Sequence, residues 1–320
     1  MISILLGSLL SLAISNIYLE GIRSYIAEEE MARISDNGRL SLNLLKRELM
    51  SAGFYGALPS MDGLSSSAVS TDCVSGGNWA LDTSVPLDFI NDFSSTASAP
   101  LRSAGGVILT CLDEAEISPG TDIVSLKRTS GNYTLRNGVY RGETSPKANR
   151  WYLKVADYGA QKQWLYHRSG GFPSADIGRG TRVDYWAYYT QIFYIRKYSE
   201  VRSDGIPTLC VERLVGGGSA GAMATRCLAE GVEDMQFEFG LDSNFDGTPN
   251  QLRDSLSKPD LNRVVVARIY LLLRSLGQVP GSARSRTYTL GTKQVHRSDG
   301  YVRRVISTTV YLPNASTAVG

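Results

Sequence analysis

Residues 1–19 of the chain, MISILLGSLLSLAISNIYL, carry no charged side chain, and Glu20 is the first one. As a helix with a rise of about 1.5 Å per residue, this stretch is about 28 Å long, close to the thickness of one hydrocarbon core. It lacks the basic leading region of a cleavable signal peptide, although Ala13-Ile14-Ser15 offers a weak cleavage site. No proline breaks the chain before Pro59. The pattern therefore favours an uncleaved apolar helix over a cleaved signal peptide.

The helical pattern continues in amphipathic form as far as Gly53, a typical residue just after a helix C-terminus. Apolar residues recur at a spacing of three or four and form a stripe along one side of the helix: Met31, Ile34, Leu42, Leu45 and Leu49. Gly38 stands in this stripe at the position between Ile34 and Leu42, where an apolar residue would be expected. A single helix over residues 1–52 would be about 78 Å long, much longer than a domain of this size is wide. We therefore expect residues 1–24 to project into lipid or a helical bundle, and residues 25–52 to pack on a sheet.

The remainder of the chain, residues 53–320, is expected to form a globular β-rich domain. Residues 59–106 are rich in Ser, Gly, Asp and Pro, which predicts a long irregular connection. Strand patterns then follow at 107–112, 122–128, 133–142, 151–156, 163–168, 182–199, 208–215, 232–242, 263–275, 286–291 and 301–312. Asn137-Gly138 predicts a type I′ hairpin, and the last two segments are expected to form a closing hairpin. One long helix followed by many strands predicts an α+β fold with an antiparallel sheet.

Composition excludes several classes of protein. Of the 320 residues, 42% are apolar and 20% are charged, which is enough to bury a core and excludes a wholly disordered chain. The net charge is only +2, so a general nucleic-acid binder is disfavoured. The two histidines, His167 and His296, leave little material for imidazole-based metal or acid–base chemistry.

The four cysteines indicate an exported domain. Cys73 and Cys111 flank the irregular region, while Cys210 and Cys227 flank a glycine-rich loop. Four cysteines allow three pairings, and we favour the sequential one because each bridge then closes one loop. Free buried thiols are the alternative. None of the four stands in a C-x-x-C motif, which argues against zinc and thioredoxin-like chemistry.

Several blocks of the sequence resemble the PilW-type minor pilins of the type IV pilus. The first is the apolar helix running into ARISDNGRLSLNLLKRELMSAGFYG (32–56); three later blocks follow in the same order, LAEGVEDMQFEFGLDSNFDGTPN (228–250), RVVVARIYLLLRS (263–275) and DGYVRRVISTTVYLPN (299–314). The resemblance implies the pilin ladle, in which the second half of a long N-terminal helix packs on an antiparallel sheet. Pilin precursors begin with a basic leader, a glycine, an aromatic residue and a glutamate, so the resemblance places Met1 just beyond that glutamate.

The resemblance also implies a function. A PilW-type protein is a non-enzymatic subunit that takes part in priming pilus assembly and in the complex at the pilus tip. Its expected partners are other minor pilins, the major pilin, a large tip adhesin and, through residues 1–24, the inner membrane. The globular domain would be periplasmic before assembly and at the cell surface afterwards, where type IV pili serve adhesion, twitching motility or DNA uptake. A minor pseudopilin of type II secretion, which shares the helix and the ladle, is the alternative.

The loop that begins at Asp242 is a candidate calcium site. Asp242, Asn244 and Asp246 place oxygen ligands at positions 1, 3 and 5 of a calcium-binding loop, with Gly247 at position 6 and the Thr248 carbonyl at position 7. Position 12 is arginine rather than the usual bidentate glutamate, so weak binding of Ca²⁺ is expected. The alternative is a plain polar turn, in which Asp, Asn and Gly are favoured anyway.

Two further sequence patterns are weaker indications of a functional site. GGSAG (217–221) matches the G-x-S-x-G motif of a hydrolase with Ser219 as nucleophile, which suggests a signal-anchored periplasmic serine hydrolase. However, this motif needs a strand before it and a helix after it, whereas strands are expected on both sides here. Basic residues also gather late in the chain, interleaved with Tyr288 and Tyr301: Arg284, Arg286, Lys293, Arg297, Arg303 and Arg304. A solvated strand face explains them better than a nucleic-acid surface, because the net charge is near zero.

Overall fold

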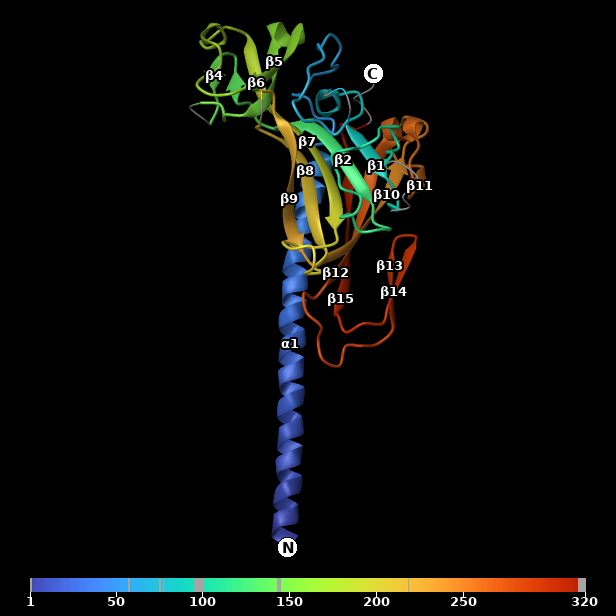
Figure 1. Ribbon diagram of the computed structural model, residues 1–320. Coiled ribbons are helices and arrows are strands. Elements are labelled where there is room, and N and C mark those ends of the chain that lie inside the picture. The colour runs from blue at the N-terminus through green and yellow to red at the C-terminus, as the bar shows by residue number, and fades with distance from the viewer. Residues whose placement is uncertain are drawn as a thin grey trace.

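In the computed structural model, residues 2–56, 58–74, 76, 78–94, 101–142, 145–217 and 219–315 are described, with backbone only for residues 2–6, 8 and 9. A single long helix enters a β-rich body and leaves its first half projecting as a stem (Figure 1). The body consists of a large antiparallel sheet, a smaller antiparallel sheet and a separate hairpin. The fold is therefore α+β, as the sequence predicted.

The helix, α1 (Ile2–Met50), is unbroken, and both of its ends lie inside the expected range of 1–52. Its last turn closes with hydrogen bonds from the Ser51 amide to the Glu48 carbonyl and from the Ala52 amide to the Leu49 carbonyl. Gly53 follows with a φ of +78°, the left-handed conformation that ends helices and that glycine adopts without strain. Its amide donates to the Lys127 carbonyl at 3.0 Å, which ties the end of the helix to the large sheet.

The large sheet is built around the long strand β7, to which β2, β3, β5 and β8 pair. Its strands are β1 (Leu87–Ile90), β2 (Ile123–Thr129), β3 (Leu135–Arg136), β4 (Val139–Tyr140), β5 (Arg150–Ala156), β6 (Gln161–His167), β7 (Val183–Arg196), β8 (Thr208–Val215) and β9 (Ala222–Glu230). Asn137 and Gly138 both have positive φ between β3 and β4, in agreement with the predicted type I′ hairpin.

The smaller sheet has the order β11-β10-β12-β15 and is antiparallel. Its strands are β10 (Val232–Leu241), β11 (Gln251–Arg253), β12 (Val264–Arg274) and β15 (Arg303–Tyr311), and the separate hairpin is β13 (Arg286–Leu290) with β14 (Lys293–Arg297). Short 3₁₀ helices lie at Trp79–Leu81, Asp157–Gly159, Ser174–Asp176 and Lys258–Arg263.

The structure differs from the strand predictions at several places. The closing hairpin is not formed, because 286–291 turns back through Gly291 (φ +61°) onto β14, while β15 pairs along the length of β12. Residues 107–112 hold one isolated bridge, Ile108 to Arg102, instead of a strand, since Cys111 bonds this segment to Cys73. Conversely, β1 lies inside the stretch expected to be irregular, and β9 was not predicted.

The second half of α1 packs against β9, β12 and β15, where the two sheets come together. Ile34, Leu45 and Leu49 of the apolar stripe are buried in the same core as Phe89, Phe193 and Phe237 from the sheets. Gly38 is the point of closest approach: a Cβ atom there would lie 2.3 Å from Ile306 Cδ1 and 3.2 Å from Leu273 Cδ1. The gap in the apolar stripe is thus a position at which the helix backbone lies close to the smaller sheet.

The opposite face of the large sheet is covered by the irregular chain that follows α1. Trp79, Leu81, Leu101 and Leu109 from this chain share a second core with Tyr188 and Ile192 of β7. Lys127 of β2 is 2% exposed, and its ammonium group donates to the carbonyl oxygens of Trp79 (2.7 Å) and Asp82 (2.8 Å). A buried lysine therefore fixes this segment to the sheet.

We predict that Gly38→Leu lowers the free energy of unfolding by about 2–3 kcal/mol, because a large side chain overpacks the contact between α1 and the smaller sheet. In Gly38→Ala the flexible end of Ile306 has to move and the end of Leu273 has to give slightly, while alanine gains about 1 kcal/mol of helix propensity, so this variant should be near neutral. Urea unfolding measures both, with Arg39→Leu on the exposed side of the helix as control. A Gly38→Leu variant as stable as the control would contradict the packing argument.

A second prediction concerns Lys127. Burial lowers the pKa of its ammonium group from 10.5 to about 8, although the nearby carboxylates of Asp82, Asp88 and Asp72 act to raise it. Between pH 8 and pH 10.5 Lys127 is protonated in the unfolded chain and mostly neutral in the folded protein. The free energy of unfolding should therefore rise with pH. The expected rise is about 1–2 kcal/mol between pH 8 and the onset of tyrosine ionisation near pH 10.

Urea unfolding at a series of pH values tests this prediction. The Lys127→Met variant should lose the rise with pH and should also be less stable, because two buried carbonyl groups lose their donor. A wild-type protein whose stability is flat or falls over this window would show that the lysine keeps its ordinary pKa.

Candidate functional site

The stem formed by the first half of α1 carries a run of exposed apolar side chains. Large apolar side chains are exposed on all its faces, among them Leu10 (65%), Ile17 (71%) and Tyr25 (68%), and also Leu12, Ile14, Tyr18, Leu19 and Ile22. Gly7 and Gly21 have open space around them. Exposed contiguous apolar surface of this extent marks a surface for association.

The membrane-spanning role expected for residues 1–24 is not supported by the described part of the stem. Within the residues that the structure describes, no helix combines the length and the apolar character needed to cross a membrane. The division into an apolar half at 1–24 and a packed half at 25–52 remains a prediction, although burial begins at Ile26, Ala27 and Met31.

Polar contacts fix the packed half of α1 along its length. The Asn37 side chain donates to the Glu230 carbonyl at the end of β9 (3.1 Å), and Arg304 of β15 donates to the Ser35 hydroxyl (3.0 Å). Near the C-terminal end, Glu48 is 3% exposed and accepts from Arg128 of β2 at 2.7 Å. The sequence analysis missed this buried ion pair; the signal was an acidic residue directly beside Leu49 of the apolar stripe.

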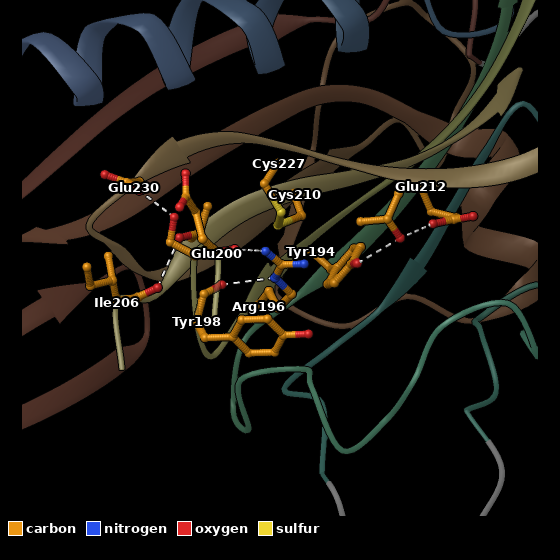
Figure 2. The surroundings of a disulfide bond; sticks show 12 residues. Tyr194, Arg196, Tyr198, Glu200, Ile206, Cys210, Glu212, Cys227 and Glu230 are labelled. Carbon is orange, nitrogen blue, oxygen red and sulfur yellow. Dashed lines mark hydrogen bonds between the residues drawn. A yellow bond between two sulfur atoms is a disulfide. The ribbon is translucent and has the colours of Figure 1, made fainter. Parts of the chain in front are cut away.

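Both disulfides join the cysteines in sequential order. Cys73–Cys111 closes the irregular region over the back of the large sheet. Cys210 and Cys227 stand directly opposite one another on β8 and β9, with Cα atoms 4.0 Å apart (Figure 2). The described residues contain no free cysteine.

The turn that follows β7 lies beside the second disulfide and is held by polar contacts (Figure 2). Arg196 donates to the carbonyl oxygens of Tyr198 (2.9 Å) and Ser199, and the Ser199 hydroxyl donates to Glu230 of β9. On the same two strands as the disulfide, the Thr225 hydroxyl of β9 donates to the Glu212 carboxylate of β8 at 2.5 Å. Burial raises the pKa of Glu212. The bridge and these contacts fix β9, one of the three strands against which α1 packs.

The oxygen atoms of the Asp242 loop are bonded within the loop. Asp242 accepts from the amides of Asp246 (3.2 Å) and Gly247 (2.7 Å). Asp246 accepts from the Thr248 hydroxyl and amide and from the Asn244 side chain, and these donors hold its pKa below the ordinary value. The described residues contain no group of three His, Cys, Asp or Glu side chains arranged to hold a metal. Calcium binding by Asp242, Asn244, Asp246 and Thr248 therefore stays a prediction.

The hydrolase motif lies in a hairpin turn. Ser219 stands between β8 and β9, so the required strand–turn–helix is not formed. Its hydroxyl makes a hydrogen bond of 3.1 Å with the Ser70 hydroxyl, and its carbonyl accepts from Arg168. His296 lies on β14, where its Nδ1 atom makes a hydrogen bond with Thr287. The geometry of a nucleophile elbow is thus missing at Ser219.

Half of the late basic residues are engaged in ion pairs. Lys293 contacts Asp234 at 2.9 Å, Arg297 contacts Glu233 at 2.7 Å, and Arg303 contacts both Glu233 and Asp299 at 2.5 Å. Lys293 also donates to the Gly120 carbonyl, which ties the β13–β14 hairpin to the loop before β2. These residues hold elements of the fold together and do not form a free basic face.

A long helix with a free apolar half and a second half packed on antiparallel sheets is the arrangement that the resemblance to pilins implied. The family model for PilW, the type IV pilus-assembly protein W, matches residues 192–314, from within β7 to just beyond β15, which confirms the resemblance to this family. Among solved structures, the chain is similar to a type IV-like pilin from Thermus thermophilus, with 13% identity, a TM-score of 0.35, and coverage of 89% of this chain and 98% of that one. No curated protein matches the chain. The family match supports a structural role connected with type IV pili.

For the disulfides we predict that peptide mapping without reductant recovers the pairs Cys73–Cys111 and Cys210–Cys227. The bridges span 38 and 17 residues. In the chain-entropy model, loops of these sizes correspond to about 4 and about 3 kcal/mol of stability, which the paired Cys→Ser variants should lose. The two double variants serve as controls for each other in urea unfolding. Recovery of crossed pairs or free thiols would contradict the assignment.

For the Asp242 loop we predict weak binding of Ca²⁺, with a dissociation constant of about 10⁻⁴–10⁻³ M, because the glutamate of position 12 is missing. At a calcium concentration about ten times this value the stability should rise by about 1 kcal/mol. Calorimetry and thermal unfolding measure both effects, with the same concentration of Mg²⁺ and an Asp242→Ala/Asp246→Ala variant as controls. An identical response of the variant and the wild type would show that the loop is a plain polar turn that does not bind Ca²⁺.

Proposed function

We propose that the protein is a minor pilin, a non-enzymatic subunit that takes part in priming type IV pilus assembly and in the complex at the pilus tip. The observation that carries this proposal is the division of α1, whose second half buries an apolar stripe against two sheets while the described side chains of the first half expose apolar groups on every face. The match of residues 192–314 to the PilW family supports it.

The mechanism follows from the cost of leaving the stem in water. Each large apolar side chain that leaves water is worth about 1.5–3 kcal/mol, so the exposed side chains between Leu10 and Tyr25 drive the stem into an apolar surrounding. Before assembly this surrounding is the inner membrane, with the globular part in the periplasm. In the pilus it is the bundle formed by the helices of the major pilin and of other minor pilins.

The globular part supplies the lateral contacts in this proposal. The disulfides, the hydrogen bonds around β9 and the ion pairs of Arg303 on β15 hold the sheets rigid, so the direction of the stem relative to the body is set. A neighbouring subunit, or a large tip adhesin, would then meet a surface of defined shape. Rigidity of this kind is what a subunit needs in order to occupy one position at the end of a filament.

The test places charge in the stem without disturbing the body. In the organism that makes the protein, Leu10→Asp/Ile17→Asp should remove the chain from sheared pili and reduce the number of pili, because a carboxylate cannot be buried unpaired in a helical bundle. Purified variant protein should keep both disulfides and the wild-type unfolding curve.

A matched control places the same charges on exposed apolar positions of the body, Val201→Asp/Leu252→Asp. This control should still enter pili, since both positions lie outside the stem. A stem variant that is recovered in pili at the wild-type level would overturn the proposal.

A further inference from the structure

We propose that a cavity between the last turn of α1 and the large sheet binds a small polar molecule that carries a carboxylate or phosphate group. The cavity has a volume of about 490 Å³. This volume lies within the range of about 300–1,000 Å³ that is usual for small-molecule sites. The inference does not depend on the pilus function proposed above.

The cavity lies where two strands diverge along one edge of β7. The pairing of β5 with β7 ends at Ala187, and the pairing of β8 with β7 begins at Gln191. The opposite edge of β7 is paired continuously with β2 across this gap, from Tyr188 to Phe193. The sheet therefore stays intact on one side while β5 and β8 separate on the other. The space between them is bordered by the end of α1.

Positive charge dominates the lining. Four arginines line the cavity, Arg47, Arg128, Arg150 and Arg213, together with a single acidic residue, Glu48. Four positive charges and one negative charge leave a net charge of +3. Glu48 is already paired, since it accepts from Arg128 at 2.7 Å and from Arg47 at 3.3 Å. No carboxylate of the cavity is left for the other two arginines.

Arg150 and Arg213 are the two arginines of the cavity at which we expect an anion to bind. Both side chains are half-buried, and within the described part of the chain neither forms an ion pair with a carboxylate. Arg150 donates to the Tyr189 hydroxyl at 3.4 Å, and its Cζ atom lies 5.5 Å from the centre of the Tyr189 ring. Half-buried guanidinium groups without a counterion favour an oxyanion, which they bind through two parallel hydrogen bonds.

The remaining lining mixes apolar side chains, such as Trp151 and Leu214, with polar ones that add acceptors and donors for a molecule larger than a bare ion. Asn149, Thr190 and Gln191 lie beside the arginines. The Oε1 atom of Gln191 is buried, and within the described residues it has no hydrogen-bond partner. A ligand hydroxyl group would supply that donor if the amide turned toward the cavity. A sugar acid combines such hydroxyl groups with a carboxylate.

The test is titration calorimetry on the full chain in neutral detergent with glucuronate, inorganic phosphate and uncharged glucose as probes. Glucuronate or phosphate should bind in a saturable manner, and added salt should weaken the binding. Glucose should not bind. Tighter binding of glucuronate would identify a carboxylate site that also recognises hydroxyl groups, whereas equal binding would identify a site that recognises the oxyanion alone. Absence of saturable binding for both anions would overturn the proposal.

Single variants assign the binding to this cavity. Arg150→Gln and Arg213→Gln should each weaken binding by about tenfold, the loss expected for one charge-assisted hydrogen-bonded contact. Arg226→Gln, at an exposed position of β9 outside the cavity, is the matched control and should bind as the wild type does. Equal binding by all three variants would overturn the proposal.

A measurement on the wild-type protein keeps the test valid if a variant fails to fold. Phenylglyoxal modifies accessible arginine side chains, and peptide mass mapping reports which ones have reacted. Saturating glucuronate or phosphate should protect Arg150 and Arg213 and leave Arg226 reactive. Unchanged modification of Arg150 and Arg213 in the presence of the anions would overturn the proposal.

Discussion

The close contact of α1 with the smaller sheet at Gly38 is the constraint on which the rest of the architecture depends. Without a side chain at this position, the helix backbone comes within packing distance of Ile306 on β15 and Leu273 on β12. Ile34 and Leu45 can then reach the core that both sheets share. Because one helix joins two sheets, the loss of this contact would expose apolar surface on all three elements.

The same helix has opposite surroundings in its two halves. The second half is fixed by a buried stripe, by the contacts of Ser35 and Asn37 with the two sheets, and by the ion pair of Glu48 with Arg128. Among the described side chains of the first half, the large apolar ones from Leu10 to Tyr25 are exposed to solvent. An isolated helix of this composition gains little from its own hydrogen bonds, so its natural state is one in which other apolar groups surround it.

The back of the large sheet depends on different interactions. An irregular chain cannot satisfy its backbone groups through a ladder, so it uses side chains of the sheet instead. Lys127 binds two of its carbonyl groups, and Tyr188 and Thr190 both donate to the Ala80 carbonyl. The Cys73–Cys111 bridge then limits how far this chain can move. The face toward α1, by contrast, is left open where β5 and β8 diverge along one edge of β7, and the arginine-lined cavity lies there.

Local patterns in the chain were sufficient for the elements that depend on near neighbours. The helical spacing before Gly53, the Asn137-Gly138 turn and the strand pattern at 232–242 all act over a few residues, and each predicted its local element correctly: a helix, a hairpin turn and a strand. Pairings between distant segments could not be read in this way. The partner of β15 is β12 because their long edges match in space, and Arg128, Arg150 and Arg213 line one cavity because three strands meet at β7. Such contacts join residues far apart in the sequence, and no short-range pattern records which surfaces will meet.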